Sequence, residues 1–174
     1  MTTLVMIETE IGTFTVALDA DRAPITVANF LAYVDAGEMA KMRAYRVVTK
    51  DNQPPGVGEV IEVVQWGLGP ERFGNPTFAP IAHEPTSQTG IRHEHMTISM
   101  ARLEPGTASA EFFICVGPQP SLDEGGHRNP DGAGFAAFGR VVEGEDVIMA
   151  IFARGEADQM VSRPVAFSGA TRLD

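Results

Sequence analysis

The chain has 174 residues, 44% hydrophobic and 21% charged, a composition that excludes a wholly disordered protein and fits a single domain over residues 1–174. Its formal net charge of −10 disfavours binding to nucleic acid or to an anionic membrane surface. The single cysteine, Cys115, excludes an internal disulfide, and its apolar neighbours predict a buried, unreactive thiol.

The first part of the chain predicts a hairpin, a helix and a strand. Residues 4–9 and 13–19 are apolar or alternating and are separated by a turn, which is typical of a β-hairpin. Apolar residues three and four apart predict an amphipathic helix over residues 24–36, before Gly37. Residues 44–48 predict a strand.

The middle of the chain is rich in proline and glycine. Residues 49–58 contain Pro-Pro-Gly, which cannot continue a strand, so a loop is predicted there. Alternation resumes over 59–67 and predicts another strand. Periodicity fades over 68–90, which we interpret as mostly loop.

The last part predicts further strands and a second helix. Strands are predicted at 96–101, 111–116 and 135–142, and a short helix follows Gly144. Residues 164–173 predict a closing strand. About eight short strands with two helices favour a mainly β fold: a closed eight-stranded antiparallel barrel capped by two α-helices, because closure removes exposed strand edges.

Common catalytic and metal-binding patterns are missing from the sequence. No Cys partners or compact acidic cluster accompany the histidines, so no metal and no cofactor are expected. No serine lies in a G-x-S-x-G turn, and no phosphate-binding glycine loop occurs. We therefore expect solvated loops to hold the four histidines, His83, His93, His95 and His127.

Two polar residues interrupt apolar strands. Arg46 lies within AYRVV, and Gln65 ends EVIEVVQ with Val63 and Ile61 at alternate positions on its face. A buried cation needs a partner or a ligand, so Arg46 and Gln65 indicate a functional site. The alternative is that Arg46 points into solvent, because successive strand residues face opposite sides.

Six segments in order carry a resemblance to a known family: RAPITVANFLAYVDAG at 22–37, YRVV at 45–48, Gln-x-Gly at 65–67, ISMAR at 98–102, ASAEFFI at 108–114 and FAAFGRVVEGEDVI at 135–148. With these, the chain resembles a divergent bacterial-type cyclophilin, a peptidyl-prolyl cis-trans isomerase, from about residue 5 to its C-terminus. The resemblance implies the same capped barrel. It also implies rotation about X–Pro bonds in proline-containing peptides and unfolded protein clients, which assists folding.

The resemblance assigns roles to individual residues. Arg46 matches the catalytic arginine, and Gln65 matches the glutamine that binds the substrate backbone and helps to hold that arginine. Ala101 and Arg102 match positions that grip the peptide through main-chain groups. The full set of implied substrate-binding residues is Val63, Ala101, Arg102, Glu111, Phe113, Leu122 and Phe135.

The chain departs from the family pattern at several of these positions. Glu62 and Val63 replace a Phe-Met pair, which predicts a shallower pocket, and Phe135 replaces a histidine. Glu111 replaces a glutamine, so Glu62 and Glu111 are expected to bring negative charge to the groove. Ser121 replaces a tryptophan, which predicts weak cyclosporin binding.

Two other functions remain open at this point. One is a proline-peptide binding module with little turnover. The other is a barrel without a peptide site, which requires Arg46 and Gln65 on the solvent face and would be supported if they were too far apart to share a hydrogen-bond network. No 18-residue apolar stretch or signal pattern occurs, so we expect no membrane contact and a cytoplasmic monomer. A periplasmic protein whose signal peptide was removed would have the same sequence.

Overall fold

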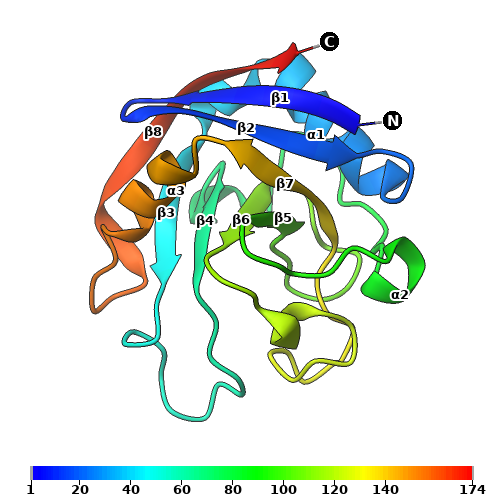
Figure 1. Cartoon of the computed structure of the whole chain (residues 1–174), viewed down its shortest axis with the longest axis vertical. Coiled ribbons are helices and arrows are strands. Elements are labelled where there is room, and N and C mark those ends of the chain that lie inside the picture. Colours follow the sequence, from blue (N-terminus) through cyan, green and yellow to red (C-terminus); the bar gives the residue numbers. More distant parts are fainter. Residues whose placement is uncertain (1, 174) are drawn as a thin grey trace.

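The computed structural model describes residues 2–173 (Figure 1). The strands are β1 (Thr2–Thr9), β2 (Gly12–Asp19), β3 (Arg43–Val48), β4 (Val63–Gly67), β5 (Thr97–Met100), β6 (Glu111–Cys115), β7 (Ala137–Glu143) and β8 (Met160–Leu173). The helices are α1 (Pro24–Asp35), α2 (Thr86–Thr89) and α3 (Glu145–Phe152), with 3-10 turns at η1 (Glu38–Lys41), η2 (Pro70–Arg72) and η3 (Pro120–Leu122).

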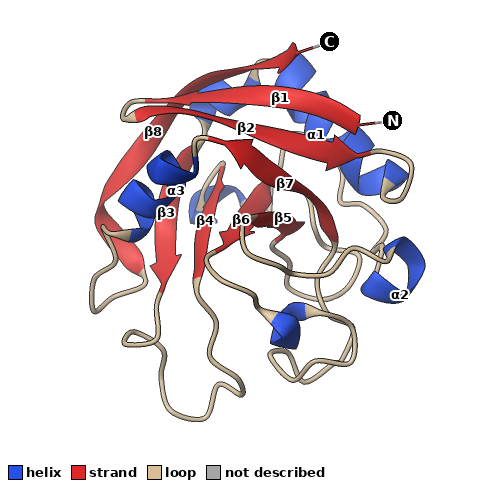
Figure 2. Cartoon of the chain, viewed as in Figure 1, coloured by secondary structure: helices blue, strands red, loops and turns tan. Residues whose placement is uncertain are grey.

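The strands close into one barrel (Figure 2). Their order is β1-β2-β7-β5-β6-β4-β3-β8, and β8 pairs with β1 to complete the ring. Every pair of neighbours is antiparallel. Buried apolar faces of α1 and α3 join the same cluster as the barrel interior. The predicted closed eight-stranded barrel with two capping helices is therefore confirmed.

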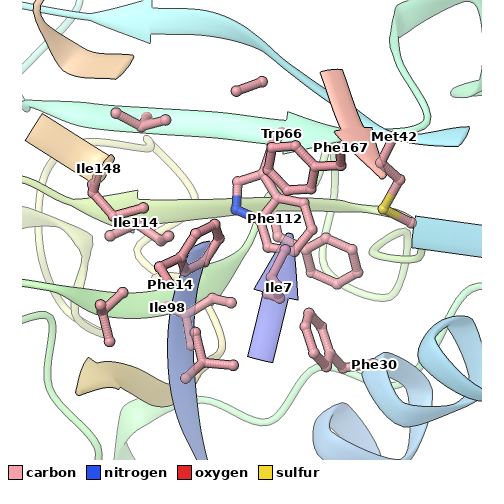
Figure 3. Packing of buried hydrophobic residues seen from close by; sticks show 14 of the residues in the cluster. Ile7, Phe14, Phe30, Met42, Trp66, Ile98, Phe112, Ile114, Ile148 and Phe167 are labelled. Carbon is pink, nitrogen blue, oxygen red and sulfur yellow. The ribbon is translucent and has the colours of Figure 1, made fainter. Parts of the chain in front are cut away.

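Strand alternation separates two apolar clusters. Even-numbered residues of β4 and β6, such as Trp66 and Phe112, point into the barrel, where Trp66 also meets Phe14 and Phe30 edge-on (Figure 3). The odd-numbered apolar residues of the same strands, Val63, Phe113 and Cys115, belong to a second, smaller cluster. Because paired strands alternate together, the sheet itself is the wall between the two clusters.

The predicted strand boundaries differ most from the structure at the start of two strands. β4 begins at Val63 rather than Glu59, because the side chain of Gln53 bonds the backbone of both Thr49 and Ile61 and closes the intervening segment as a loop. β8 begins at Met160 rather than Pro164. Its proline falls where the register against β3 shifts, a place that needs no ladder N–H.

Short helical segments occur in parts of the chain that were interpreted as loop. α2 and η2 are single turns within the predicted loop over 68–90. None of the helices over residues 2–173 has the length and apolar character needed to cross a membrane.

Candidate active site

Three neighbouring strands place the predicted site residues in one row. Arg46 on β3 is paired with Gln65 on β4, and Gln65 is paired with Phe113 on β6. Directly opposed residues of antiparallel strands point to the same face of the sheet. The register therefore brings a cation, a carboxamide and an aromatic ring together on the outer wall of the barrel.

A β-bulge in β3 adds Tyr45 to this face. Ala44 is paired with Trp66 and Arg46 with Gln65, which leaves Tyr45 as the extra residue between them. Bulges re-aim side chains and are frequent beside active sites. Here the bulge brings the hydroxyl of Tyr45 within 2.8 Å of Gln65 Nε2.

Arg46 is held by two carboxamides. Its Nη1 donates to Gln65 Oε1 at 2.7 Å, and its Nε and Nη2 donate to Gln159 Oε1 at 3.0 and 2.6 Å. Within residues 2–173 no carboxylate forms an ion pair with this guanidinium. Burial lowers the pKa of Arg46, and the charge of Arg128 lowers it further. The site thus presents an oriented cation whose charge is not neutralised by an acidic partner.

The second apolar cluster lies directly beside this cation. It brings together five of the predicted residues, and three residues that were not assigned to the site, Val48, Ile61 and Cys115, contribute to it as well. Phe113 meets Phe135 edge-on, with 5.7 Å between ring centroids. The predicted members are Val63, Ala101, Phe113, Leu122 and Phe135.

The side chain of Arg102 stabilises one wall of this cluster. It is 1% exposed, pairs with both carboxylate oxygens of Asp131 at 2.9 and 3.1 Å, and donates to the carbonyls of Leu103 and Gly134. The guanidinium carbon also lies 4.7 Å from the centroid of the Phe135 ring. The resemblance assigns Arg102 a main-chain role, which stays a prediction; its side chain additionally fixes Phe135.

Glu111 lies behind the row, not in the apolar cluster. It is 8% exposed, and its Oε1 accepts from the hydroxyl of Tyr45 at 2.6 Å. The amide of Gly69 approaches both carboxylate oxygens at 3.3 and 3.4 Å. Burial raises the pKa of Glu111 to about 7, although these hydrogen bonds oppose the rise. Glu111 therefore contacts the polar row rather than the open groove.

Glu62 lies beside a cation. Its carboxylate lies 3.7 Å from Lys50 Nζ, and the side chain is outside the apolar cluster that contains its neighbour Val63. Alternation of the extended chain explains this, because adjacent residues face opposite sides. Negative charge from Glu62 is thus partly offset by Lys50.

The prediction of solvated histidines is wrong for His93. Its ring is buried, contacts Asp123 through Nδ1 and Ser99 through Nε2 at 2.8 Å each, and stacks on Phe113 at 6.0 Å. Over residues 2–173, no group of three His, Cys, Asp or Glu side chains is arranged to hold a metal ion. Cys115 is fully buried, as predicted, and burial raises the pKa of its thiol.

Sequence reasoning missed two polar residues of the site. Gln159 lies in the loop before β8, 113 positions after Arg46, and no periodicity marks it. Tyr45 has a sequence signal, since it precedes Arg46, but alternation assigns it to the opposite face. Only the bulge places it beside Gln65.

Comparisons with known proteins agree with this geometry. The family model described as "Cyclophilin type peptidyl-prolyl cis-trans isomerase/CLD" matches residues 4–168. "Peptidyl-prolyl cis-trans isomerase cyp18" of Streptomyces antibioticus is 35% identical, and the match covers 97% of this chain and 98% of that protein.

Solved structures share the fold. A cyclophilin-type peptidyl-prolyl cis-trans isomerase of Cryptosporidium parvum has a TM-score of 0.75 at 17% identity, covering 100% of this chain and 99% of that one. A second structure of that protein, in the presence of the dipeptide Ala-Pro, has a TM-score of 0.74 at 17% identity and covers 98% of this chain and 99% of that one. From the family match over most of its length, the chain belongs to the cyclophilin-type peptidyl-prolyl cis-trans isomerases.

Proposed function

We propose that this chain accelerates rotation about X–Pro peptide bonds, with the proline ring in the outer apolar cluster and Arg46 at the prolyl nitrogen. The observation that carries the proposal is the guanidinium of Arg46, oriented by Gln65 and Gln159 and without an acidic partner, directly beside an apolar cluster. The Ala-Pro dipeptide used with the Cryptosporidium parvum relative supports a proline-containing ligand.

The reaction needs no nucleophile and no proton relay. Rotation about an amide breaks its resonance, which gives a barrier of about 18–20 kcal/mol and X–Pro exchange over tens to hundreds of seconds. As the bond twists, the prolyl nitrogen regains a lone pair. Arg46 can donate a hydrogen bond to that lone pair, whereas the planar amide offers none, so the interaction favours the transition state over the ground state.

One hydrogen bond does not supply the whole acceleration. A charge-assisted hydrogen bond contributes about 1.5–3 kcal/mol, and more in a dry site. An acceleration of about five decades requires about 7 kcal/mol. The remaining stabilisation comes from apolar surroundings that favour the less polar twisted amide, and from Phe113, Leu122 and Phe135, which hold the ring while the preceding carbonyl rotates.

We further propose that its substrates are proline-containing segments of unfolded protein clients, whose refolding it assists in the cytoplasm. The net charge of −10 suits a protein that does not associate with nucleic acid in that compartment. Such clients expose X–Pro bonds that isomerise slowly enough to limit folding.

The test is exchange NMR of a short Ala-Pro peptide with the wild-type protein and with Arg46→Ala. We expect acceleration by wild type and a loss of tenfold or more in Arg46→Ala. Arg154→Ala is the matched control, because within residues 2–173 the side chain of Arg154 donates only to the carbonyl of Arg163 on the surface. Arg46→Lys should also lose most of the activity, because lysine lacks the planar fork of donors.

Two outcomes would contradict this assignment. Wild-type turnover in folded Arg46→Ala would remove Arg46 from the reaction. Peptide binding by the wild type without faster cis/trans exchange would instead identify a proline-peptide binding module. The barrel without a peptide site would be supported if Arg46 and Gln65 were far apart, and they lie 2.7 Å from each other.

A further inference from the structure

A chain of three buried hydrogen bonds connects Arg46 to a carboxylate. Arg46 Nη1 donates to Gln65 Oε1 at 2.7 Å, Gln65 Nε2 donates to Tyr45 Oη at 2.8 Å, and Tyr45 Oη donates to Glu111 Oε1 at 2.6 Å. Gln65, Tyr45 and Glu111 are 5%, 3% and 8% exposed. Water therefore has little access to replace any of these bonds.

The two ends of this chain determine the direction of every bond in it. A guanidinium has only donors, and an ionised carboxylate has only acceptors. The carboxamide of Gln65 must therefore turn its oxygen to Arg46 and its NH₂ to Tyr45, whose O–H then points to Glu111. The reversed carboxamide would place an NH₂ group against the guanidinium and leave both without an acceptor.

We propose that Tyr45 and Glu111 are positioning residues, which hold the carboxamide of Gln65 with its oxygen toward Arg46 and thereby aim the guanidinium at the prolyl nitrogen. This inference rests on the isomerase activity proposed above. The polar ends of both side chains bond other polar groups: Tyr45 bonds Gln65 and Glu111, and the carboxylate of Glu111 also accepts from the amide of Gly69. Their effect is expected on turnover, because a misdirected guanidinium loses the bond that forms only with the twisted amide.

Gly67 makes room for this arrangement. Glu111 is paired with Gly67 across β4 and β6, and a Cβ at Gly67 would lie only 2.6 Å from the carboxylate carbon of Glu111. With no side chain there, the carboxylate can cross the strand and reach Tyr45. Glycine at position 67 therefore leaves the space in which the carboxylate of Glu111 accepts the hydrogen bond from Tyr45.

The other groups that face Glu111 come from three elements. From β3, Arg43 attracts its negative charge, with the guanidinium carbon 5.5 Å from the centroid of the Tyr45 ring. After β4, the backbone amide of Gly69 donates to the carboxylate, and the nearby amide of Leu68 lowers the pKa of Glu111. From α1, Tyr33 has a pKa that is raised mainly by burial and further by the charges of Glu38 and Glu111.

Protonation of Glu111 removes the constraint on direction. A neutral carboxyl can donate to Tyr45 as well as accept from it, so the O–H of Tyr45 becomes free to donate to a reversed Gln65. Both ends fix the direction of the Gln65 carboxamide while Glu111 is ionised, whereas only Arg46 opposes its reversal once Glu111 is neutral. The pKa of Glu111 is raised by burial to about 7, so turnover is expected to increase as the pH rises through neutrality.

The test measures kcat and KM for an Ala-Pro peptide from about pH 5 to about pH 9. Tyr45→Phe should lower kcat about tenfold and leave KM within about twofold. Its matched control is Tyr33→Phe, the other tyrosine of the chain, whose hydroxyl accepts a bond from the amide of Phe78. Glu111→Gln should give a flat pH profile at the level of the acidic wild type, because a carboxamide also both donates and accepts. Its control is Glu84→Gln, which removes a buried carboxylate bonded to Thr26 and should keep the wild-type profile.

A second readout does not depend on turnover. The side-chain NH₂ resonances of Gln65 and the Nε–H resonance of Arg46 should titrate together in wild type and lose that titration in Glu111→Gln. Wild-type kcat in folded Tyr45→Phe, or a wild-type pH profile in Glu111→Gln, would overturn the positioning role. If the wild type lacks turnover but shows the coupled titration, only the proposed isomerase activity fails.

Discussion

The prediction with the best internal control concerns two Arg–Asp pairs that differ in burial. Arg102 is 1% exposed and pairs with Asp131, whereas Arg172 is 38% exposed and pairs with Asp35. Both arginines donate to both carboxylate oxygens of their partners. Substitution of each arginine by methionine keeps the apolar stem and removes the charge, so the comparison sets a buried arginine with additional backbone partners against an exposed one.

The expected cost follows from what each substitution leaves behind. Arg102→Met strips the carbonyls of Leu103 and Gly134 of their donor and leaves Asp131 without its cation. Breaking a buried pair in this way costs about 3–5 kcal/mol, and the lower end applies because Asp131 is 32% exposed and can be rehydrated. For a chain of this size, about 3 kcal/mol lowers Tm by about 6–12 °C. Arg172→Met should cost no more than about 1 kcal/mol.

Urea unfolding monitored by the fluorescence of the single tryptophan, Trp66, gives both free energies. Arg102→Met should also raise KM for a proline peptide, because Phe135 loses the cation that lies over its ring. Equal destabilisation by the two substitutions would refute the argument from burial. An unchanged KM in folded Arg102→Met would show that Phe135 is held in place without it.

Three further outcomes are expected. The pKa of Glu111 is raised from an ordinary 4.5 to about 7, so between these pH values the folded protein keeps a proton that the unfolded chain releases. As the pH rises through this window, the free energy of unfolding of the wild type should therefore fall by about 3 kcal/mol relative to that of Glu111→Gln. Urea titrations at each pH measure both. A parallel pH dependence of the two proteins would contradict the raised pKa. Gly144→Ala should destabilise the fold by more than about 2 kcal/mol in thermal melts, because φ is +81° and the new Cβ would lie 2.6 Å from the Cα of Phe14. Its control, Gly37→Ala, has φ +74° and no atom within 4 Å, so it should cost only about 1 kcal/mol. Equal costs would show that the clash with Phe14 contributes nothing. Gln159→Leu should lower kcat for peptide exchange more than it changes KM, because Nε and Nη2 of Arg46 lose their acceptor. Unchanged kinetics would show that Gln65 alone orients Arg46.

Local patterns in the sequence predicted much of the fold. Alternation identified β2, an apolar run identified β6, spacing of three and four identified α1, and the residues at 63, 113, 122 and 135 were correctly expected to lie together. Start and stop positions were less accurate where a side chain outside the strand decides them. Gln53 closes the loop before β4, and no local signal at residue 59 indicates that the strand begins at Val63.

The polar part of the site depended on contacts that no local pattern contains. Gln159 reaches Arg46 from the loop before β8, and Tyr45 reaches Gln65 because of a bulge. The side chain of Arg102 was assigned no role of its own, although it pairs with Asp131, 29 residues later. Periodicity shows which residues are buried, but it does not show which buried polar groups bond one another.

The sheet that divides the two apolar clusters has a consequence for how the protein can change. Substitutions at Val63 or Leu122, outside the barrel, share no apolar cluster with Trp66 or Phe112 inside it. Effects at sites without shared partners are close to additive. Substitutions in the outer cluster can therefore change ligand preference, in evolution or in a selected library. The contribution of the barrel interior to the free energy of unfolding should change little when they do.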